Sequence, residues 1–253
     1  MNIIKSFIMA FSMYSKIPMP NVEWDEKSMK YAICFFPVIG IVIGAVFFSV
    51  YFLCGIFNTG DILRAALMTA VPVFISGGIH IDGFLDTTDA LSSYGGREKK
   101  LEILKDPHTG AFAIIGAGIY FLLFFAFLTE VNSNAAIISI GIGFILSRAL
   151  SGLGIGIFKC AKNSGLLHTF KNASHRKAVI ISMIFYIVSC ITALCFTGIY
   201  GIAVIAVAFL SFLWYRYISY KQFGGITGDI AGYFVCISEL LCVVAGGLLC
   251  VLL

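Results

Sequence analysis

Seven long apolar runs divide this chain, and they constrain its fold more than any other feature of the sequence. Each run has about 20 residues, the length that an α-helix needs to cross the hydrocarbon core of a bilayer. Within that core a helix satisfies its own backbone hydrogen bonds. The sequence therefore predicts membrane-spanning helices at 31–56, 62–81, 111–129, 135–158, 178–197, 199–218 and 230–253.

The composition agrees with a protein that lies in a membrane. Only 12% of the 253 residues are charged and 60% are hydrophobic, whereas an average soluble domain has about 25% charged residues. The mean hydropathy is +0.99. These values exclude a soluble enzyme, a disordered protein and a nucleic-acid-binding protein with a basic face. We expect an all-α, polytopic helical bundle with residues 1–253 in a single domain, and a helix at the membrane interface over the short apolar segment 3–14.

The basic residues indicate how the helices are oriented. With the N-terminus in the cytoplasm, the segments on that side are 1–30, 82–110, 159–177 and 219–229, and with their flanks they hold 15 of the 17 Lys and Arg residues. Loops rich in Lys and Arg remain on the cytoplasmic side of a membrane. We therefore expect a cytoplasmic N-terminus, an external C-terminus and all long loops in the cytoplasm.

The densest group of polar residues is GGIHIDGFLDTTDAL at 77–91. Asp82, Asp86 and Asp89 are spaced i, i+4 and i+7, so on a helix all three project from one face. Three carboxylates this close repel one another unless a cation neutralises them. Hard oxygen ligands suit Mg²⁺, which commonly also binds substrate phosphates, so the trio predicts a Mg²⁺ site. The alternative is a solvated helix start that the helix dipole stabilises.

His80 stands two residues before the first of these carboxylates. Its ring could orient a carboxylate, donate a hydrogen bond to a phosphate or act as a general acid. A purely structural role is equally consistent with the sequence.

Two short stretches after this group have features of phosphate-binding segments. Gly95 and Gly96 let a backbone approach a phosphate closely, and Arg97 can bind that phosphate through two hydrogen bonds. Lys105 and Asp106 place a cation and a further carboxylate just before a membrane helix. Interfacial cations also occur simply because of membrane topology.

The segment GGITGD at 224–229 opens the last apolar run. Thr227 can cap the helix, and Asp229 lies in the first turn, where a carboxylate is favoured. Asp229 also lies on the same side of the membrane as Asp82. We therefore expect the two carboxylates to converge on one site, where they hold a metal–diphosphate unit between two helices.

Two charged residues lie inside apolar runs, where an ionisable group is costly and usually has a partner. Glu239 follows Asp229 by ten residues, and Arg148 lies midway along the run at 135–158. Arg148 could pair with Glu239 or with a substrate phosphate, and we expect its side chain to face the site rather than lipid. The basic loop 159–177 is interpreted as a contact with lipid headgroups in preference to an anionic substrate.

Taken in order, these motifs resemble those of the cobalamin synthase family, adenosylcobinamide-GDP ribazoletransferase. The resemblance rests on the run at 77–90, the GGR at 95–97 and KDPHTGAF at 105–112. It extends to GITGD at 225–229 with Glu239 downstream, and to SKIPMP near the N-terminus. At 107–109, PHT replaces a stretch that usually contains arginine, which leaves open whether His108 substitutes for that residue.

The resemblance implies a Mg²⁺-dependent membrane transferase with its active site on the cytoplasmic side of a prokaryotic cell membrane. Such an enzyme joins adenosylcobinamide-GDP to α-ribazole, or to its 5′-phosphate, and releases GMP. The implied catalytic residues are His80 and four aspartates, of which Asp82, Asp86 and Asp89 also hold the metal. The fourth catalytic aspartate is Asp106. Substrate binding is implied for a second group of residues: Gly95, Gly96, Arg97, Lys105, Arg148, Thr227, Asp229 and Glu239.

Two other classes of protein stay open at this stage. A membrane phosphotransferase of the CDP-alcohol type, acting on lipid, would need a D-G-x-x-A-R signature, but Asp86 and Thr87 occupy the Ala-Arg positions. A small polytopic transporter would carry its polar residues near the bilayer midplane, whereas here they gather at helix ends. The expected partners are the two substrates and the lipid bilayer, not nucleic acid. A homo-oligomer and an association with other corrinoid-assembly enzymes both stay open.

Overall fold

The computed structural model describes residues 2–162 and 164–253, and within these ranges the chain forms helices and connections but no strand. A single parallel bridge joins the backbone of Cys160 to that of Ile226. The elements are α1 (Asn2–Tyr14), α2 (Glu26–Met29), the 3₁₀ helix η1 (Ala32–Phe35), α3 (Phe36–Ile56), α4 (Asp61–Ser76), α5 (Ile79–Ser92), α6 (Arg97–Ile103), α7 (Ala111–Glu130), α8 (Asn134–Ile157), α9 (Leu166–Ala173), α10 (Arg176–Cys195), α11 (Ile199–Ile218), the π-helical turn η2 (Ser219–Phe223) and α12 (Gly228–Leu252).

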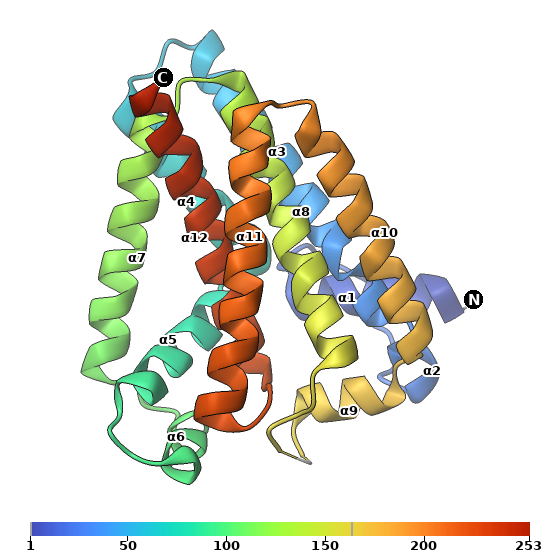
Figure 1. Cartoon of the computed structure of the whole chain (residues 1–253). Helices are drawn as coiled ribbons and strands as arrows, with labels where there is room; N and C mark the ends of the chain where they lie inside the picture. Colours follow the sequence, from blue (N-terminus) through green and yellow to red (C-terminus); the bar gives the residue numbers. More distant parts are fainter. Residues whose placement is uncertain (1, 163) are drawn as a thin grey trace.

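Six of the described helical segments are long and apolar enough to cross a membrane: η1 with α3, α7, α8, α10, α11 with η2, and α12. They lie side by side and run up and down through the bundle in Figure 1. A seventh span results if the bent pair formed by α4 and α5 is counted as one. The expectation of an all-α, polytopic bundle with about seven spans is confirmed.

The prediction of one continuous helix at 62–81 is wrong, because the helix breaks before residue 81. Helix α4 ends at Ser76, and the axis of α5 is bent by 94° from it. Gly77 and Gly78 both adopt left-handed backbone conformations, with φ of 66° and 79°, which glycine adopts without the steric cost that other residues meet. Because the helix breaks there, the carboxylates of α5 lie on a separate short helix that crosses the end of the bundle (Figure 1).

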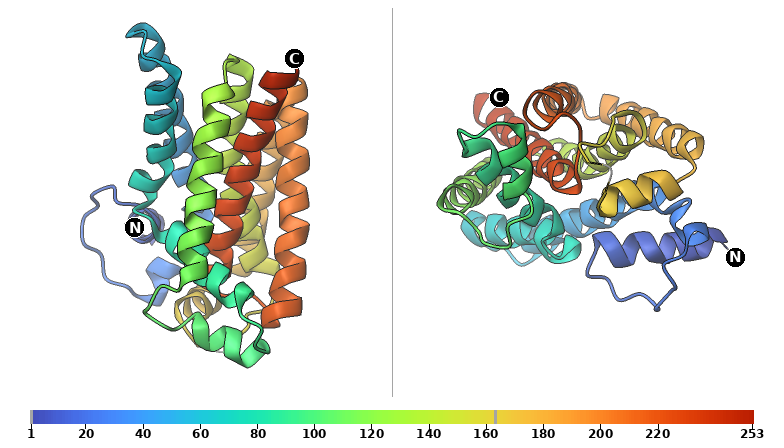
Figure 2. Two further views of the ribbon diagram at one scale, coloured as in Figure 1. Left: turned by 90° about the vertical axis from the view of Figure 1, so that its left-hand side faces the viewer. Right: turned by 90° about the horizontal axis from the view of Figure 1, so that it is seen from below.

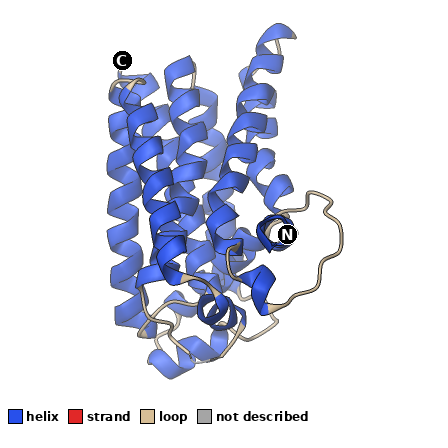
Figure 3. Ribbon diagram, turned by 90° about the vertical axis from the view of Figure 1, so that its right-hand side faces the viewer, coloured by secondary structure: helices blue, strands red, loops and turns tan. Residues whose placement is uncertain are grey.

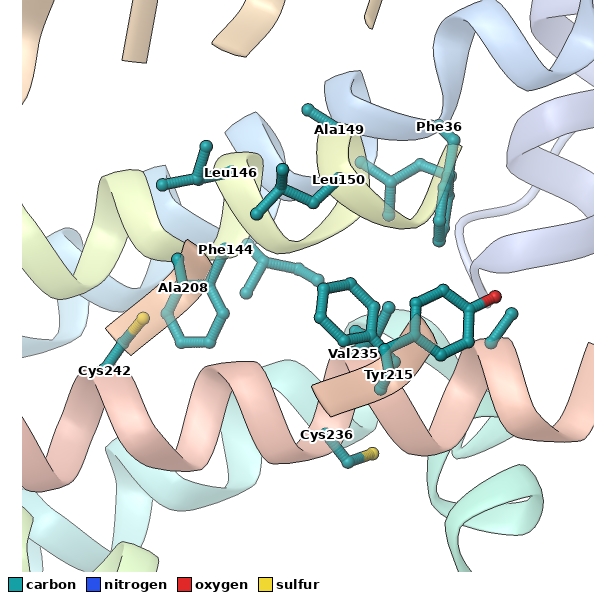
Figure 4. Close-up of a cluster of buried hydrophobic side chains, with 14 of the residues drawn as sticks. Phe36, Phe144, Leu146, Ala149, Leu150, Ala208, Tyr215, Val235, Cys236 and Cys242 are labelled. Atoms are coloured by element: carbon teal, nitrogen blue, oxygen red, sulfur yellow. The ribbon is translucent and has the colours of Figure 1, made fainter. Parts of the chain in front are cut away.

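Helices α8 and α12 form the interior of the bundle. Most of α8 is buried, and Figure 4 shows its Phe144 beside Ala208 of α11 and Cys242 of α12. Two glycines of α3 bring that helix close to α8, because a Cβ on Gly40 or on Gly44 would clash with the backbone of α8. Small residues are the usual means of close helix packing in membranes.

The two ends of the bundle differ. One end has only the short turns at 57–60, 131–133 and 196–198 and the C-terminus, whereas the other has α2, α5, α6, α9 and every long connection. Helix α1 lies across the direction of the spanning helices, as Figure 2 shows in the view from below. This position agrees with the expected interfacial helix. The connection that follows α1 extends outward from the bundle, as Figure 3 shows.

The first testable prediction concerns which side of the membrane each end faces. Because the basic residues concentrate at the end with the long connections, reporter fusions at positions within 92–105 and 166–175 should report a cytoplasmic location. A fusion after Leu253 should report the outside. A cytoplasmic C-terminus would contradict the arrangement of seven spans.

Candidate functional site

A cavity of about 430 Å³ lies at the end of the bundle that has the long connections. Its walls come from α1, α3, α5, α8, α9 and α12 and from the segments that follow α6 and α8. Five of the residues predicted from the sequence line the cavity: His80, Asp82, Lys105, Thr227 and Asp229.

Asp82 and Asp229 reach this cavity from two helices that pack at glycines. A Cβ on Gly83 would lie 2.9 Å from the Cα of Asp229, and a Cβ on Gly232 would lie 3.4 Å from the Cα of His80. Only residues without side chains permit backbones this close. The two distant motifs, which were expected to converge, thus place Asp82 and Asp229 in the wall of one cavity through the contact between α5 and α12.

The start of α12 holds Asp229 in place. Thr227 caps the helix by accepting a hydrogen bond from the backbone N–H of Ile230 at 3.3 Å, as expected. Its hydroxyl also donates to Oδ2 of Asp229, likewise at 3.3 Å. The Asp229 carboxylate is thus anchored on one side and faces the cavity on the other.

The three carboxylates of α5 have different surroundings. Asp89 accepts hydrogen bonds from the backbone N–H groups of Gly110 at 2.5 Å and Ala113 at 2.9 Å, and so it caps the start of α7. Asp86 lies between Asp82 and Asp89 along α5, and the negative charges of Asp82, Asp89 and Asp229 repel its carboxylate. Across residues 2–162 and 164–253, no three His, Cys, Asp or Glu side chains are grouped closely enough to hold a metal by themselves.

Two lysines supply the positive charge of the cavity. Lys105 was expected there, but Lys162 was not, because the loop 159–177 was assigned to lipid headgroups. Lys162 donates a hydrogen bond to the carbonyl of Leu101 at 2.8 Å. Partial burial, followed by the nearby charge of Lys105, lowers its pKa. Nothing in the sequence separates Lys162 from lysines that are present only for topology.

Arg97 and the two glycines before it lie outside the lining of this cavity. The Arg97 guanidinium donates to the carbonyl of Ala161 at 3.3 Å and lies over Gly224, where a Cβ would collide with it. Gly95 donates its N–H to the Ser93 hydroxyl at 3.1 Å. In this structure Arg97 therefore connects α6 to the segments beside the cavity rather than lining it.

Asp106 also lies outside the main cavity, in a shallower hollow of about 330 Å³ that it shares with Asp89. The side chain of Asp106 is paired with His108 at 2.7 Å. Hydrogen bonds from the backbone and the ring of His108 lower the pKa of this carboxyl group. His108 is thus the direct partner of Asp106.

Arg148 and Glu239 form an ion pair in the bundle interior, with Nη1 and Oε1 2.5 Å apart. Arg148 is fully buried, and the same nitrogen donates to the carbonyl of Phe144 at 2.8 Å. Neither residue lines the cavity. Of the two partners that the sequence left open for Arg148, the structure shows Glu239.

His80 is buried and packs against two rings that also contact each other, that of Phe36, 5.5 Å away, and that of Tyr14, 6.4 Å away. Its Nε2 has no hydrogen-bond partner among the described residues. The aromatic surroundings give His80 a packing role in the cavity wall, beside Asp82.

The fold and the site define a class: a polytopic α-helical membrane protein with a cavity at one end, where carboxylates from two helices face lysines. Carboxylates opposed by lysines suit a ligand that contains phosphate and a divalent cation. The chain matches the cobalamin-5-phosphate synthase family over residues 6–247, and it belongs to that family.

Three relatives illustrate the match, and each is named adenosylcobinamide-GDP ribazoletransferase. The protein of Lachnoclostridium phytofermentans is 52% identical over 94% of this chain and 91% of its own length. That of Clostridium perfringens is 35% identical over 93% and 94%. That of Treponema denticola is 33% identical over 94% and 95%. No solved structure matches this chain.

Proposed function

We propose that this protein transfers the adenosylcobinamide phosphoryl group of adenosylcobinamide-GDP to the 5′-hydroxyl of α-ribazole or α-ribazole 5′-phosphate. The products are adenosylcobalamin, or its phosphate, and GMP. The observation that carries this proposal is that Asp82 and Asp229, from two helices, share one cavity with Lys105 and Lys162. The names of the relatives support the choice of substrates, and family membership disfavours the lipid phosphotransferase and the transporter.

The donor is a diphosphate diester, and the reaction replaces one phosphorus–oxygen bond by another. The α-ribazole 5′-oxygen bonds to the phosphorus attached to cobinamide, the bond from that phosphorus to the bridging oxygen breaks, and GMP leaves. Attack on an anionic phosphorus needs charge neutralisation and alignment more than it needs a strong base. Lys105 and Lys162 can neutralise the phosphate oxygens.

The carboxylates fit the Mg²⁺ that the family resemblance implies. Mg²⁺ is commonly bound by one or two carboxylates together with substrate phosphates, and the cavity offers Asp82 and Asp229, with Asp86 close enough to repel both. Bound there, Mg²⁺ would offset this repulsion and the charge of the diphosphate. The hydroxyl proton goes to a carboxylate of the same group, where it also relieves repulsion between neighbours.

The active site in this proposal faces the cytoplasm. It lies at the end of the bundle where the basic loops gather, and such loops remain in the cytoplasm. Both substrates would then reach the site without crossing the membrane.

The test is an assay of the purified protein in lipid vesicles with adenosylcobinamide-GDP, α-ribazole and Mg²⁺. We expect GMP and adenosylcobalamin in equal amounts, both dependent on α-ribazole and both abolished by EDTA. GMP release that does not need α-ribazole would indicate a hydrolase instead. An absence of GMP release would contradict the proposal.

A second prediction tests the contact between α5 and α12. Gly83→Ala should lower GMP release at least tenfold, because the new methyl group would collide with the backbone of Asp229 and move the two carboxylates apart. The matched control is Gly118→Ala on α7, where a Cβ meets no atom within 4 Å. Full activity in the Gly83→Ala variant would show that the helix contact is not needed.

A further inference from the structure

The cavity has two unlike sides. The charged side consists of Asp82, Lys105, Lys162 and Asp229 on and beside α5 and α12. The rest of the wall, which we call the apolar side, comes from α1, α3, α8 and α9 and is mostly apolar. Figure 2, in the view from below, shows α1, α3 and α9 gathered away from α5 and α6. The apolar side is formed by Met13, Tyr14, Phe36, Ile155, Leu167 and Phe170.

Aromatic rings stiffen the apolar side. The rings of Tyr14 and Phe36 are 4.6 Å apart. Phe170 is 1% exposed and meets the ring of Trp24 edge to face at 6.0 Å. Rings fixed in this way keep their positions in the cavity wall, so little conformational entropy is lost there when a ligand binds.

We infer that the apolar side binds the planar base of the acceptor nucleoside, a methylated benzimidazole. The inference rests on the proposed function. A cavity of about 430 Å³ is within the size range that takes a small organic ligand. A nucleoside has this size, whereas a corrinoid is several times larger and would remain largely outside.

The chemistry of the wall favours this base over the guanine of the donor. Guanine has donors and acceptors along two edges, and burying them without partners costs free energy. Among the residues that α1, α3, α8 and α9 contribute to the lining, three side chains can form such bonds, those of Tyr14, Ser151 and His168, which is fewer than the donors and acceptors of guanine. A methylated benzimidazole has a mostly apolar edge, so the same wall stabilises it by contact. With the base on this side, the ribose 5′-hydroxyl points toward the carboxylates.

The experiment uses paired variants on two helices of the apolar side. Leu167→Asn on α9 and Met13→Gln on α1 put an amide into the wall. Their controls, Thr169→Asn and Ser12→Asn, change residues of the same helices that do not line the cavity. Each protein is reconstituted in vesicles, its thermal unfolding is compared with that of the wild type, and the KM values for both substrates are measured from GMP release.

We expect both cavity variants to raise the KM for α-ribazole at least tenfold while the KM for adenosylcobinamide-GDP stays within twofold. The controls should change neither value. Equal increases in the two KM values would place the donor on the apolar side, and unchanged values would show that the wall binds neither substrate. Either result would overturn the inference.

A binding measurement separates this inference from the proposed function. Equilibrium dialysis of α-ribazole and, separately, of guanosine against the wild-type protein in vesicles needs neither donor nor turnover. Tighter binding of α-ribazole, weakened at least tenfold by Leu167→Asn but not by Thr169→Asn, would support the base site even if no GMP is released. No binding of α-ribazole, or tighter binding of guanosine, would refute it.

Discussion

Asp82→Asn is expected to lower GMP release by at least about a hundredfold, with the protein still inserted and folded. Removing one preorganised hydrogen-bond donor that stabilises a transition state typically costs about two to three orders of magnitude in rate, and we expect the loss of a charged ligand to the cation to cost at least as much. Asp82 lines the cavity, and no hydrogen bond or salt bridge of its side chain is found among the described residues. Its carboxylate is therefore free for the cation, and Asn cannot supply the charge. Asp229→Asn should have a comparable effect on turnover.

Asp89→Asn provides the internal comparison, because Asp89 belongs to the same motif but caps α7. An Asn side chain keeps one acceptor oxygen and loses one of the two hydrogen bonds, so we expect a loss of about 1 kcal/mol in the free energy of unfolding and a smaller loss of turnover. Titration of Mg²⁺ in the assay separates the roles. Asp82→Asn should raise the Mg²⁺ concentration needed for half-maximal rate, whereas Asp89→Asn should not.

Equal losses of turnover and of apparent Mg²⁺ affinity in the Asp82→Asn and Asp89→Asn variants would indicate a three-carboxylate site. The helix cap at α7 would then have to open when metal binds. Near-normal turnover in the Asp82→Asn variant would instead return the carboxylates of α5 to a solvated helix face.

The sequence was sufficient to predict the fold class because membrane spans are encoded locally. Each apolar run is long enough to identify by itself, and six of the seven match long helices. The break at Gly77 was missed because the apolar pattern continues through Ile81. Two adjacent glycines were the available signal, and they indicate where a helix can break but not by what angle.

The site was predictable only in part, because its geometry depends on distant contacts. That Asp82 and Asp229 come together followed from the side of the membrane on which both motifs lie. Asp89 can cap α7 only because α7 starts beside α5. The i+7 spacing within α5 does not predict which other helix starts there. Lys162 was missed for the same reason, since its place in the cavity depends on how the loop after α8 packs.

The second large effect is expected at the buried ion pair. Glu239→Gln should lower the free energy of unfolding by about 3–5 kcal/mol, because it leaves the charge of Arg148 buried without a counter-charge. Arg148 is fully buried, with Glu239 within 2.5 Å, so water cannot replace the lost partner. The measurement is thermal or denaturant-induced unfolding of the purified protein, with insertion checked by membrane fractionation.

A double variant decides whether the pair also binds substrate. Replacing both residues, as in Arg148→Met with Glu239→Leu, removes both charges together, and exchanging a buried pair for apolar side chains is often neutral or stabilising. If the pair only holds α8 to α12, the double variant should recover most of the stability and keep the wild-type KM for adenosylcobinamide-GDP. If Arg148 leaves Glu239 to bind the diphosphate during turnover, the double variant will fold but its KM for the donor will rise at least tenfold. Because neither residue lines the cavity, we expect the first result.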